Sequence, residues 1–193
     1  MLQRRVHDPP DAPQALALRE ISRAAAFVAL AMLLPPVFHA LRLGHVFLPM
    51  VQPLLLGAFF LRPRWALAVG ALTPLVSALT TGMPPLLPPI AVWMSAEVGL
   101  MAVLVSLLDR RTRLPAPLVV LMALVAGRLL YTALVYATSV WLALPAGMMT
   151  AAAVVSSWPG MLVALFVIPA AVVGVRRARS LPRPAAAGPS ETP

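Results

Sequence analysis

Long apolar segments alternate with short clusters of arginine along the chain. The clusters are Arg4/Arg5/Arg19/Arg23, Arg62/Arg64, Arg110/Arg111/Arg113 and Arg176/Arg177/Arg179/Arg183. Between consecutive clusters lies enough apolar sequence for two membrane crossings of about 20 residues each. Because Lys and Arg are retained on the cytoplasmic side of a bilayer, the pattern predicts six transmembrane helices with both termini in the cytoplasm.

The six predicted spans cover about residues 21–41, 46–61, 65–80, 90–108, 117–144 and 150–175. We expect Pro35-Pro36 to interrupt the first span, since proline lacks the amide donor of a helical hydrogen bond. Residues 1–20 are predicted to be a cytoplasmic lead-in, with a short helix over 15–23 along the membrane surface. Residues 21–178 form the membrane domain, and the Pro- and Ala-rich residues 179–193 are predicted to be a disordered cytoplasmic tail. The expected fold is an all-α membrane bundle.

Composition supports a membrane protein and narrows its chemistry. Hydrophobic residues make up 61% of the chain and charged residues 11%, and the mean hydropathy is +0.90. A soluble domain would carry about 25% charged residues. The net charge of +9 does not indicate nucleic acid, because the arginines flank apolar segments and form no patch interleaved with aromatic residues. The absence of lysine alongside abundant Ala, Leu, Pro and Arg is typical of a bacterial genome rich in G and C.

Catalytic motifs are missing from the sequence. There is no cysteine, no Walker A loop, no HExxH and no Ser/His/Asp grouping. Glu97 is the one acid expected at membrane depth, so a mechanism with two carboxylates or two metals cannot be assembled. We therefore expect no enzymatic activity, no metal and no covalently bound cofactor, and any use of ATP would belong to partner subunits.

Two ionisable residues fall within predicted spans. Each such group costs about 3 kcal/mol at the centre of a bilayer, so we expect Glu97 and Arg128 to have a structural or functional role. With a rise of about 1.5 Å per residue, Glu97 lies roughly 12 Å below the outer end of its span and Arg128 roughly 24 Å along a tilted helix. The two side chains could therefore meet in the middle-to-outer half of the membrane. They form a structural ion pair that pins two helices, contact a ligand, or are mispacked or snorkel towards the lipid headgroups.

Other polar and small residues extend this picture. Hydroxyl residues at helical spacing, which are Thr73, Ser77, Thr80 and Thr81, indicate either helix–helix hydrogen bonds or one wall of a binding site. His39 is equally an interfacial residue or a ligand contact, and Gln52, Tyr131 and Trp158 would complete a polar lining. Ala25 and Ala29 form a small-xxx-small step on the first span, which is either ordinary bundle packing or a surface for another helix.

Several short sequence motifs resemble those of the substrate-binding S components of energy-coupling factor (ECF) vitamin transporters. The motifs are His39 after Pro35-Pro36, Leu48-Pro49-Met50 with Pro53, Pro74 and Ser77 before Thr81-Gly82-Met83-Pro84-Pro85, Glu97, Ala126-Gly127-Arg128 with Tyr131, and Pro159-Gly160 with Pro169. The resemblance covers about residues 21–178. Val51 stands where a polar residue often follows Leu-Pro-Met, and Met101-Ala102 replaces a common Tyr-Gly pair, so the substrate is left open.

The resemblance implies six helices around one site near the outer face, closed by external loops. It implies a water-soluble vitamin or precursor as ligand, bound by His39, Met50, Gln52, Ser77, Thr80, Thr81, Gly82, Met83, Glu97, Arg128, Tyr131 and Trp158. It also implies docking through Ala25 and Ala29 onto a membrane coupling subunit driven by two ABC ATPases in the bacterial cytoplasmic membrane. The alternatives are a six-span scaffold that resembles the rod-shape protein D family and, disfavoured by the missing acid clusters, a membrane-embedded transferase or protease.

Overall fold

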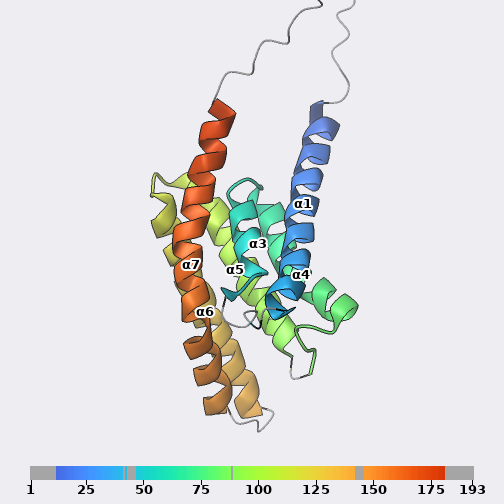
Figure 1. Cartoon of the computed structure of the whole chain (residues 1–193), viewed down its shortest axis with the longest axis vertical. Coiled ribbons are helices and arrows are strands. Elements are labelled where there is room, and N and C mark those ends of the chain that lie inside the picture. The colour runs from blue at the N-terminus through green and yellow to red at the C-terminus, as the bar shows by residue number, and fades with distance from the viewer. Residues whose placement is uncertain (1–11, 41, 43–46, 88, 142–145, 181–193) are drawn as a thin grey trace, which may run out of the picture.

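The computed structural model describes residues 12–40, 42, 47–87, 89–141 and 146–180, with side chains for all of these except 12–14, 39 and 146–157. Within these ranges the regular structure is entirely helical, as the sequence predicts. The helices are α1 (Ala12–Ala40), α3 (Val51–Ala58), α4 (Pro63–Thr81), α5 (Ile90–Arg111), α6 (Ala116–Trp141) and α7 (Ala146–Ser180). Figure 1 shows them packed in one elongated bundle, with the start of α1 and the end of α7 at the same end.

Among the described residues, four helices are long and apolar enough to cross a membrane. These stretches are Ala15–Phe38 of α1, Ile90–Arg111, Ala116–Trp141 and Trp158–Ser180 of α7. Helix α3 has 8 residues and is therefore only about 12 Å long. The second span predicted over 46–61 is thus not one long helix, because residues 48–50 and 59–61 lie outside α3. The chain is a multi-pass membrane protein on the evidence of the four long helices.

The first helix differs from the sequence prediction in two ways. Helix α1 runs without a break from Ala12 to Ala40, so the separate surface helix over 15–23 is not present. The helix also continues through Pro35 and Pro36, so the predicted interruption is wrong. Two missing amide donors free the carbonyls of Ala31 and Met32 one turn earlier. Ala31 is fully buried, which places this turn against protein, where a proline within a membrane helix is tolerated.

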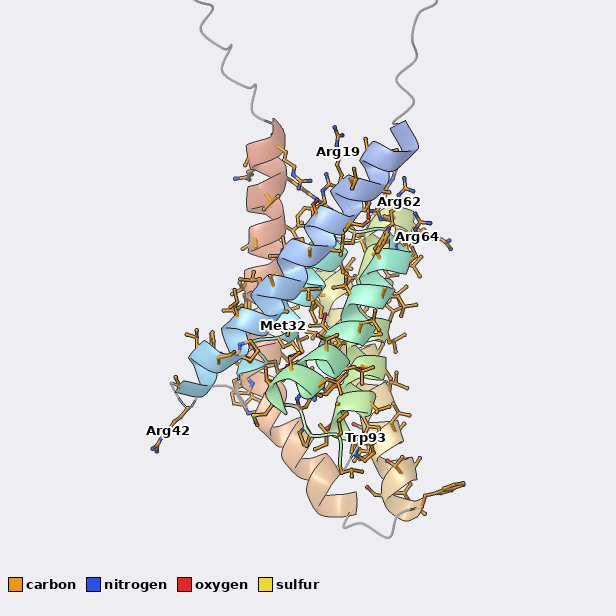
Figure 2. All side chains as sticks on the ribbon, turned by 90° about the vertical axis from the view of Figure 1, so that its right-hand side faces the viewer. Arg19, Met32, Arg42, Arg62, Arg64 and Trp93 are labelled. Carbon is orange, nitrogen blue, oxygen red and sulfur yellow. The ribbon has the colours of Figure 1, made fainter. Side chains whose placement is uncertain are left out.

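The four arginine clusters meet at one end of the bundle as far as the structure describes them. Contacts at this end join Arg62 to Glu20, Arg110 to Leu61, Arg176 to Asp109 and Arg179 to Phe60. Figure 2 shows Arg19, Arg62 and Arg64 at this arginine-rich end and Arg42 at the opposite end. The alternation of arginine and apolar segments therefore predicted correctly which ends of the helices lie together.

The turn between α3 and α4 is fastened to α5 at the arginine-rich end. The carbonyl oxygen of Leu61 accepts a hydrogen bond of 2.7 Å from Ser106 Oγ and one of 3.1 Å from Arg110 Nη2. Ser106 is fully buried. Leu61 follows the end of α3, so no amide of that helix bonds to its carbonyl. The two side-chain donors of α5 supply the missing hydrogen bonds.

Helices α4 and α5 approach closely through small residues. A Cβ atom added to Gly70 would lie 2.7 Å from the carbonyl oxygen of Val98 and 3.1 Å from Gly99 Cα. A Cβ on Gly99 would in turn lie 3.1 Å from Ala71 Cβ. Such close backbone packing is typical of membrane helices. They associate largely through van der Waals packing instead of the hydrophobic effect, and small residues allow that close approach.

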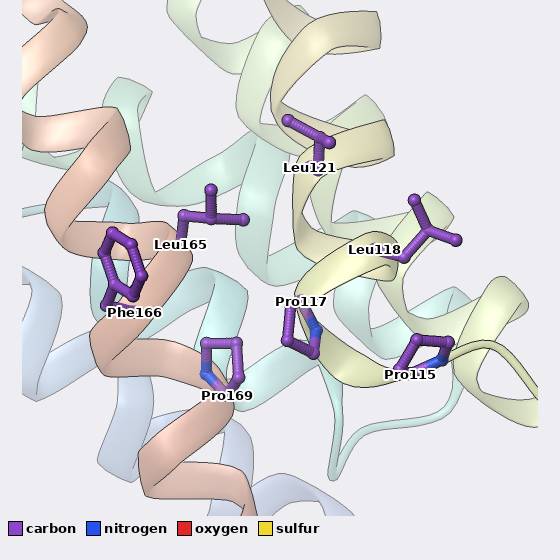
Figure 3. A pocket seen from close by; sticks show the side chains of 7 residues that line it. All are labelled: Pro115, Pro117, Leu118, Leu121, Leu165, Phe166 and Pro169. Carbon is purple, nitrogen blue, oxygen red and sulfur yellow. The ribbon is translucent and has the colours of Figure 1, made fainter.

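An apolar groove of about 430 Å³ lies between α6 and α7 (Figure 3). Its lining consists of Pro115, Pro117, Leu118, Leu121, Leu165, Phe166 and Pro169. Pro115 directly precedes α6, and the others come from the start of α6 and the second half of α7, so the groove lies towards the arginine-rich end. None of the binding residues predicted from the sequence lines this α6–α7 groove.

Candidate functional site

Glu97 on α5 and Arg128 on α6 form an ion pair inside the bundle. Arg128 Nη2 lies 2.7 Å from Glu97 Oε1. The exposed fractions of the side chains are 1% for Glu97 and 14% for Arg128, so neither faces the lipid. The two atoms are close enough for strong electrostatic attraction but are not aligned for a hydrogen bond. The meeting of these residues, expected from their depths, is confirmed.

Two aromatic residues complete this site. Trp93 stands one turn before Glu97 on α5, and Tyr131 stands one turn after Arg128 on α6. Their rings meet edge to face, with centroids 6.4 Å apart and an interplanar angle of 88°. The guanidinium carbon of Arg128 lies 5.4 Å from the centroid of Tyr131, which is within the range of a cation–π contact. We call Trp93, Glu97, Arg128 and Tyr131 the ion-pair cluster.

The charged pair of Glu97 and Arg128 lies between two apolar regions of the bundle. Towards the opposite end, Trp93 and Tyr131 pack with Val135 in a small buried group. Towards the arginine-rich end, Met101 of α5 packs against Gly127 of α6 so closely that a Cβ at Gly127 would overlap its side chain. Met101 belongs to the main apolar core. The charged pair is therefore bounded by a tightly packed apolar floor on one side and by aromatic rings on the other.

The pairing of Glu97 with Arg128 also fixes the relative levels of their helices. Glu97 is about 10 Å from the start of α5, whereas Arg128 is about 20 Å from the end of α6. Helix α6 therefore extends beyond α5 at the opposite end, as Figure 1 shows. Trp141, the last residue of α6, is 91% exposed on this extension.

The hydroxyl residues of α4 are satisfied by their own helix and the turn that follows it. Thr73 donates to Val69 O at 2.6 Å, and Thr81 donates to Ser77 O at 2.8 Å. Thr80 likewise donates to a carbonyl one turn earlier, at 2.8 Å. The sequence allowed two interpretations of these hydroxyls, helix–helix hydrogen bonds or one wall of a binding site. The described hydrogen bonds join no second helix, and each threonine hydroxyl already donates within α4, so they favour neither interpretation.

The turn after α4 is built by Ser77 and Gly82. Ser77 is buried and donates a hydrogen bond of 2.7 Å to the carbonyl of Met83. Gly82 caps α4 with φ of 74°, a left-handed conformation that favours glycine, and its amide donates to Ala78 O. The peptide bond between Met83 and Pro84 is cis. The Gly-Met-Pro-Pro motif forms a compact turn, in which the Met83 side chain is 55% exposed.

The structure gives the burial or the contacts of the remaining predicted residues. Met50 is buried, and the Gln52 side chain donates to the carbonyl of Phe47 at 2.8 Å. Trp158 of α7 is 58% exposed. His39 lies in α1, but its side chain is outside the part that the structure describes. The two residues of α1 predicted to dock on a partner, Ala25 and Ala29, are both exposed.

Trp93 is the member of the ion-pair cluster that sequence reasoning missed. The available signal was its position one turn from Glu97, which places both residues on one face of a helix. Tryptophan in a membrane span is most often assigned to the interface, so it did not stand out beside charged residues. Among the described residues there is no group of three or more His, Asp or Glu that could hold a metal ion.

Comparison with known families gives one result. Residues 19–176 match the family model described as ECF transporter, substrate-specific component. No match is found among curated proteins, and none among solved structures. The family match spans α1 to the last turns of α7 and includes the ion-pair cluster. The chain therefore belongs to the family of substrate-specific components of ECF transporters.

Proposed function

We propose that this chain is the S component of an ECF-type importer for a water-soluble vitamin or precursor. It captures the ligand at the outer face and delivers it inward with a coupling subunit and two ABC ATPases. The observation that carries this proposal is the buried ion-pair cluster in a chain of the S-component family. A charged pair is costly within a membrane and is typically retained for function. The rod-shape scaffold alternative gains no support from the family match.

The proposed topology has six crossings, with the arginine-rich end in the cytoplasm of a bacterium. The positive-inside rule supports this orientation, because all described members of the four arginine clusters lie at one end. The four long helices supply four crossings. Helix α3 with its flanking residues and helix α4 supply the other two, since Leu61 between them lies at the arginine-rich end.

The ion-pair cluster is proposed to be the centre of the ligand site. Arg128 offers a planar fork of donors that suits a carboxylate or a phosphate. Trp93 and Tyr131 offer faces and edges for a ring. Glu97 balances the charge of Arg128, so a ligand with an anionic group would have to share Arg128 with it. The cluster thus favours a ligand that carries both a polar head and a ring or alkyl body.

The outer part of the site is proposed to be closed by the turn after α4. Ser77 holds the carbonyl of Met83, and the exposed Met83 side chain is free to cover a ligand. The other proposed contacts are His39, Met50, Gln52, Thr80, Thr81, Gly82 and Trp158. Ala25 and Ala29 are proposed to dock on the coupling subunit, because exposed small residues on a helix allow another helix to approach closely.

Uptake in whole cells tests this function. The chain is produced with and without an ECF coupling subunit and its ATPases in a bacterium that lacks its own vitamin importers, and labelled B-type vitamins are supplied one at a time. We expect energy-dependent uptake of one vitamin or precursor when the full module is present. Correctly folded protein that takes up none of them, with or without the module, would contradict the proposal and favour a scaffold.

A further inference from the structure

The α6–α7 groove has the composition of a lipid-facing cleft. Its lining residues are all apolar, and three of the seven are prolines, which have no amide hydrogen to donate. Phe166 is 71% exposed and Leu121 is 43% exposed, so the groove is open on one side. An apolar cleft with so few polar partners does not hold ordered water. Its volume of about 430 Å³ is within the range of pockets that bind small ligands.

Positive charge stands at the end of the groove. Arg113 precedes the lining residue Pro115 by two positions and is exposed. Arg177 follows Phe166 by about three helical turns, so it lies on the same face of α7 and about 16 Å farther towards the arginine-rich end. Both arginines are exposed, and neither forms an ion pair within the described residues.

Within the described residues, the nearby acid Asp109 does not neutralise this charge. Asp109, at the end of α5, is engaged by Arg176, whose Nη2 lies 2.8 Å from both carboxylate oxygens. Arg176 is thus neutralised locally, whereas Arg113 and Arg177 keep their charge for another anion. The apolar groove lies farther from the arginine-rich end than the two cations do. A lipid in the membrane has the same arrangement, with its acyl chain inside and its phosphate at the surface.

We propose that the α6–α7 groove binds an anionic phospholipid from the leaflet at the arginine-rich end. One acyl chain lies along Leu118, Leu121 and Leu165, and the phosphate lies between Arg113 and Arg177. Basic sites between membrane helices at the cytoplasmic surface bind anionic headgroups through this combination of charge and apolar contact. The proposal concerns a site distinct from the ion-pair cluster, and it does not depend on which vitamin is carried.

Native mass spectrometry of the full chain tests the headgroup part of this proposal. Delipidated protein in detergent is titrated with phosphatidylglycerol or with phosphatidylcholine. We expect tighter binding of phosphatidylglycerol, and a loss of about 30-fold in that affinity in the double variant Arg113→Gln/Arg177→Gln, at about 5-fold for each arginine. Arg42→Gln, which removes an exposed arginine at the opposite end, should bind like the unchanged protein. Equal binding of the two lipids, or equal loss in Arg42→Gln, would overturn the proposal.

A groove-filling variant tests the acyl-chain part. Leu118→Trp occupies the groove and should weaken binding of both lipids, whereas Leu129→Trp, at a position on α6 that is 67% exposed outside the groove, should not. Circular dichroism on heating shows whether each variant is folded, and Leu121→Trp replaces Leu118→Trp if the latter is not. Retained phosphatidylglycerol binding in a folded groove-filled variant overturns the proposal. A groove-filled variant that no longer assembles with the coupling subunit but still binds lipid also overturns the proposal, because the α6–α7 groove would then bind a helix of that subunit.

Discussion

Removing the charge of Glu97 should destabilise the bundle far more than removing the charge of a carboxylate whose arginine partner is exposed. The change Glu97→Gln keeps the size of the side chain but leaves the guanidinium of Arg128 inside the bundle without its counter-charge. The matched control is Asp109→Asn, which breaks the ion pair with Arg176, whose side chain is 52% exposed. Both ion pairs have similar contact distances, 2.7 Å and 2.8 Å, so burial is the main difference between them.

The expected magnitudes follow from that difference in burial. Charge centres about 4 Å apart attract by about 4 kcal/mol at an effective dielectric constant of about 20. Breaking a buried pair by removing one partner typically costs about 3–5 kcal/mol, because the remaining charge stays buried. An exposed pair contributes about 0–1 kcal/mol. We therefore expect Glu97→Gln to lower the free energy of unfolding by about 3–5 kcal/mol and Asp109→Asn by less than about 1 kcal/mol.

The double variant Glu97→Gln/Arg128→Met completes the experiment. Because it removes both charges, it should be less destabilised than the sum of the two single variants. The free energy of unfolding is measured in detergent micelles by titration with dodecyl sulfate, followed by circular dichroism. A cost below about 1 kcal/mol for Glu97→Gln, or additive effects in the double variant, would refute the view that these charges stabilise each other inside the protein.

Three further outcomes are expected. Gly70→Ala should lower the free energy of unfolding by about 1–3 kcal/mol, because the new methyl group meets the Val98 carbonyl. Gly174→Ala should leave that free energy unchanged, because its methyl group meets nothing within 4 Å, and dodecyl sulfate titration measures both variants. Ala25→Leu should abolish uptake with the coupling module while isothermal titration shows unchanged vitamin binding, and Ala133→Leu, an exposed change on α6, should leave uptake intact. Ser106→Ala should cost about 1 kcal/mol of unfolding free energy through loss of its bond to Leu61, and no loss on dodecyl sulfate titration would contradict that role.

The parts of the fold that the sequence predicted depend on strong physical preferences. Arginine is expensive in hydrocarbon, so its clusters marked the helix ends that meet at one end of the bundle. The same cost applied to Glu97 and Arg128, and a simple rise per residue was enough to place them in contact. Those predictions needed no knowledge of how the helices pack.

The parts that were missed depend on tertiary packing. Pro35 and Pro36 were expected to break the first span, yet the burial of Ala31 lets the helix continue. The length of α3 could not be read from an apolar run that also includes its flanking turns. The binding role of the α4 hydroxyls stays a prediction, since Thr73, Thr80 and Thr81 bond to carbonyls of their own helix, which the same helical spacing allows.

Native mass spectrometry of the chain purified from its host, in a detergent that preserves bound ligands, tests the central claim most directly. The account predicts one vitamin-sized molecule per chain, and its loss when Glu97 or Arg128 is replaced by alanine in protein that remains folded. A folded chain that carries only lipid, or whose small ligand is retained at full occupancy in both alanine variants, would contradict the claim that the ion-pair cluster binds the substrate.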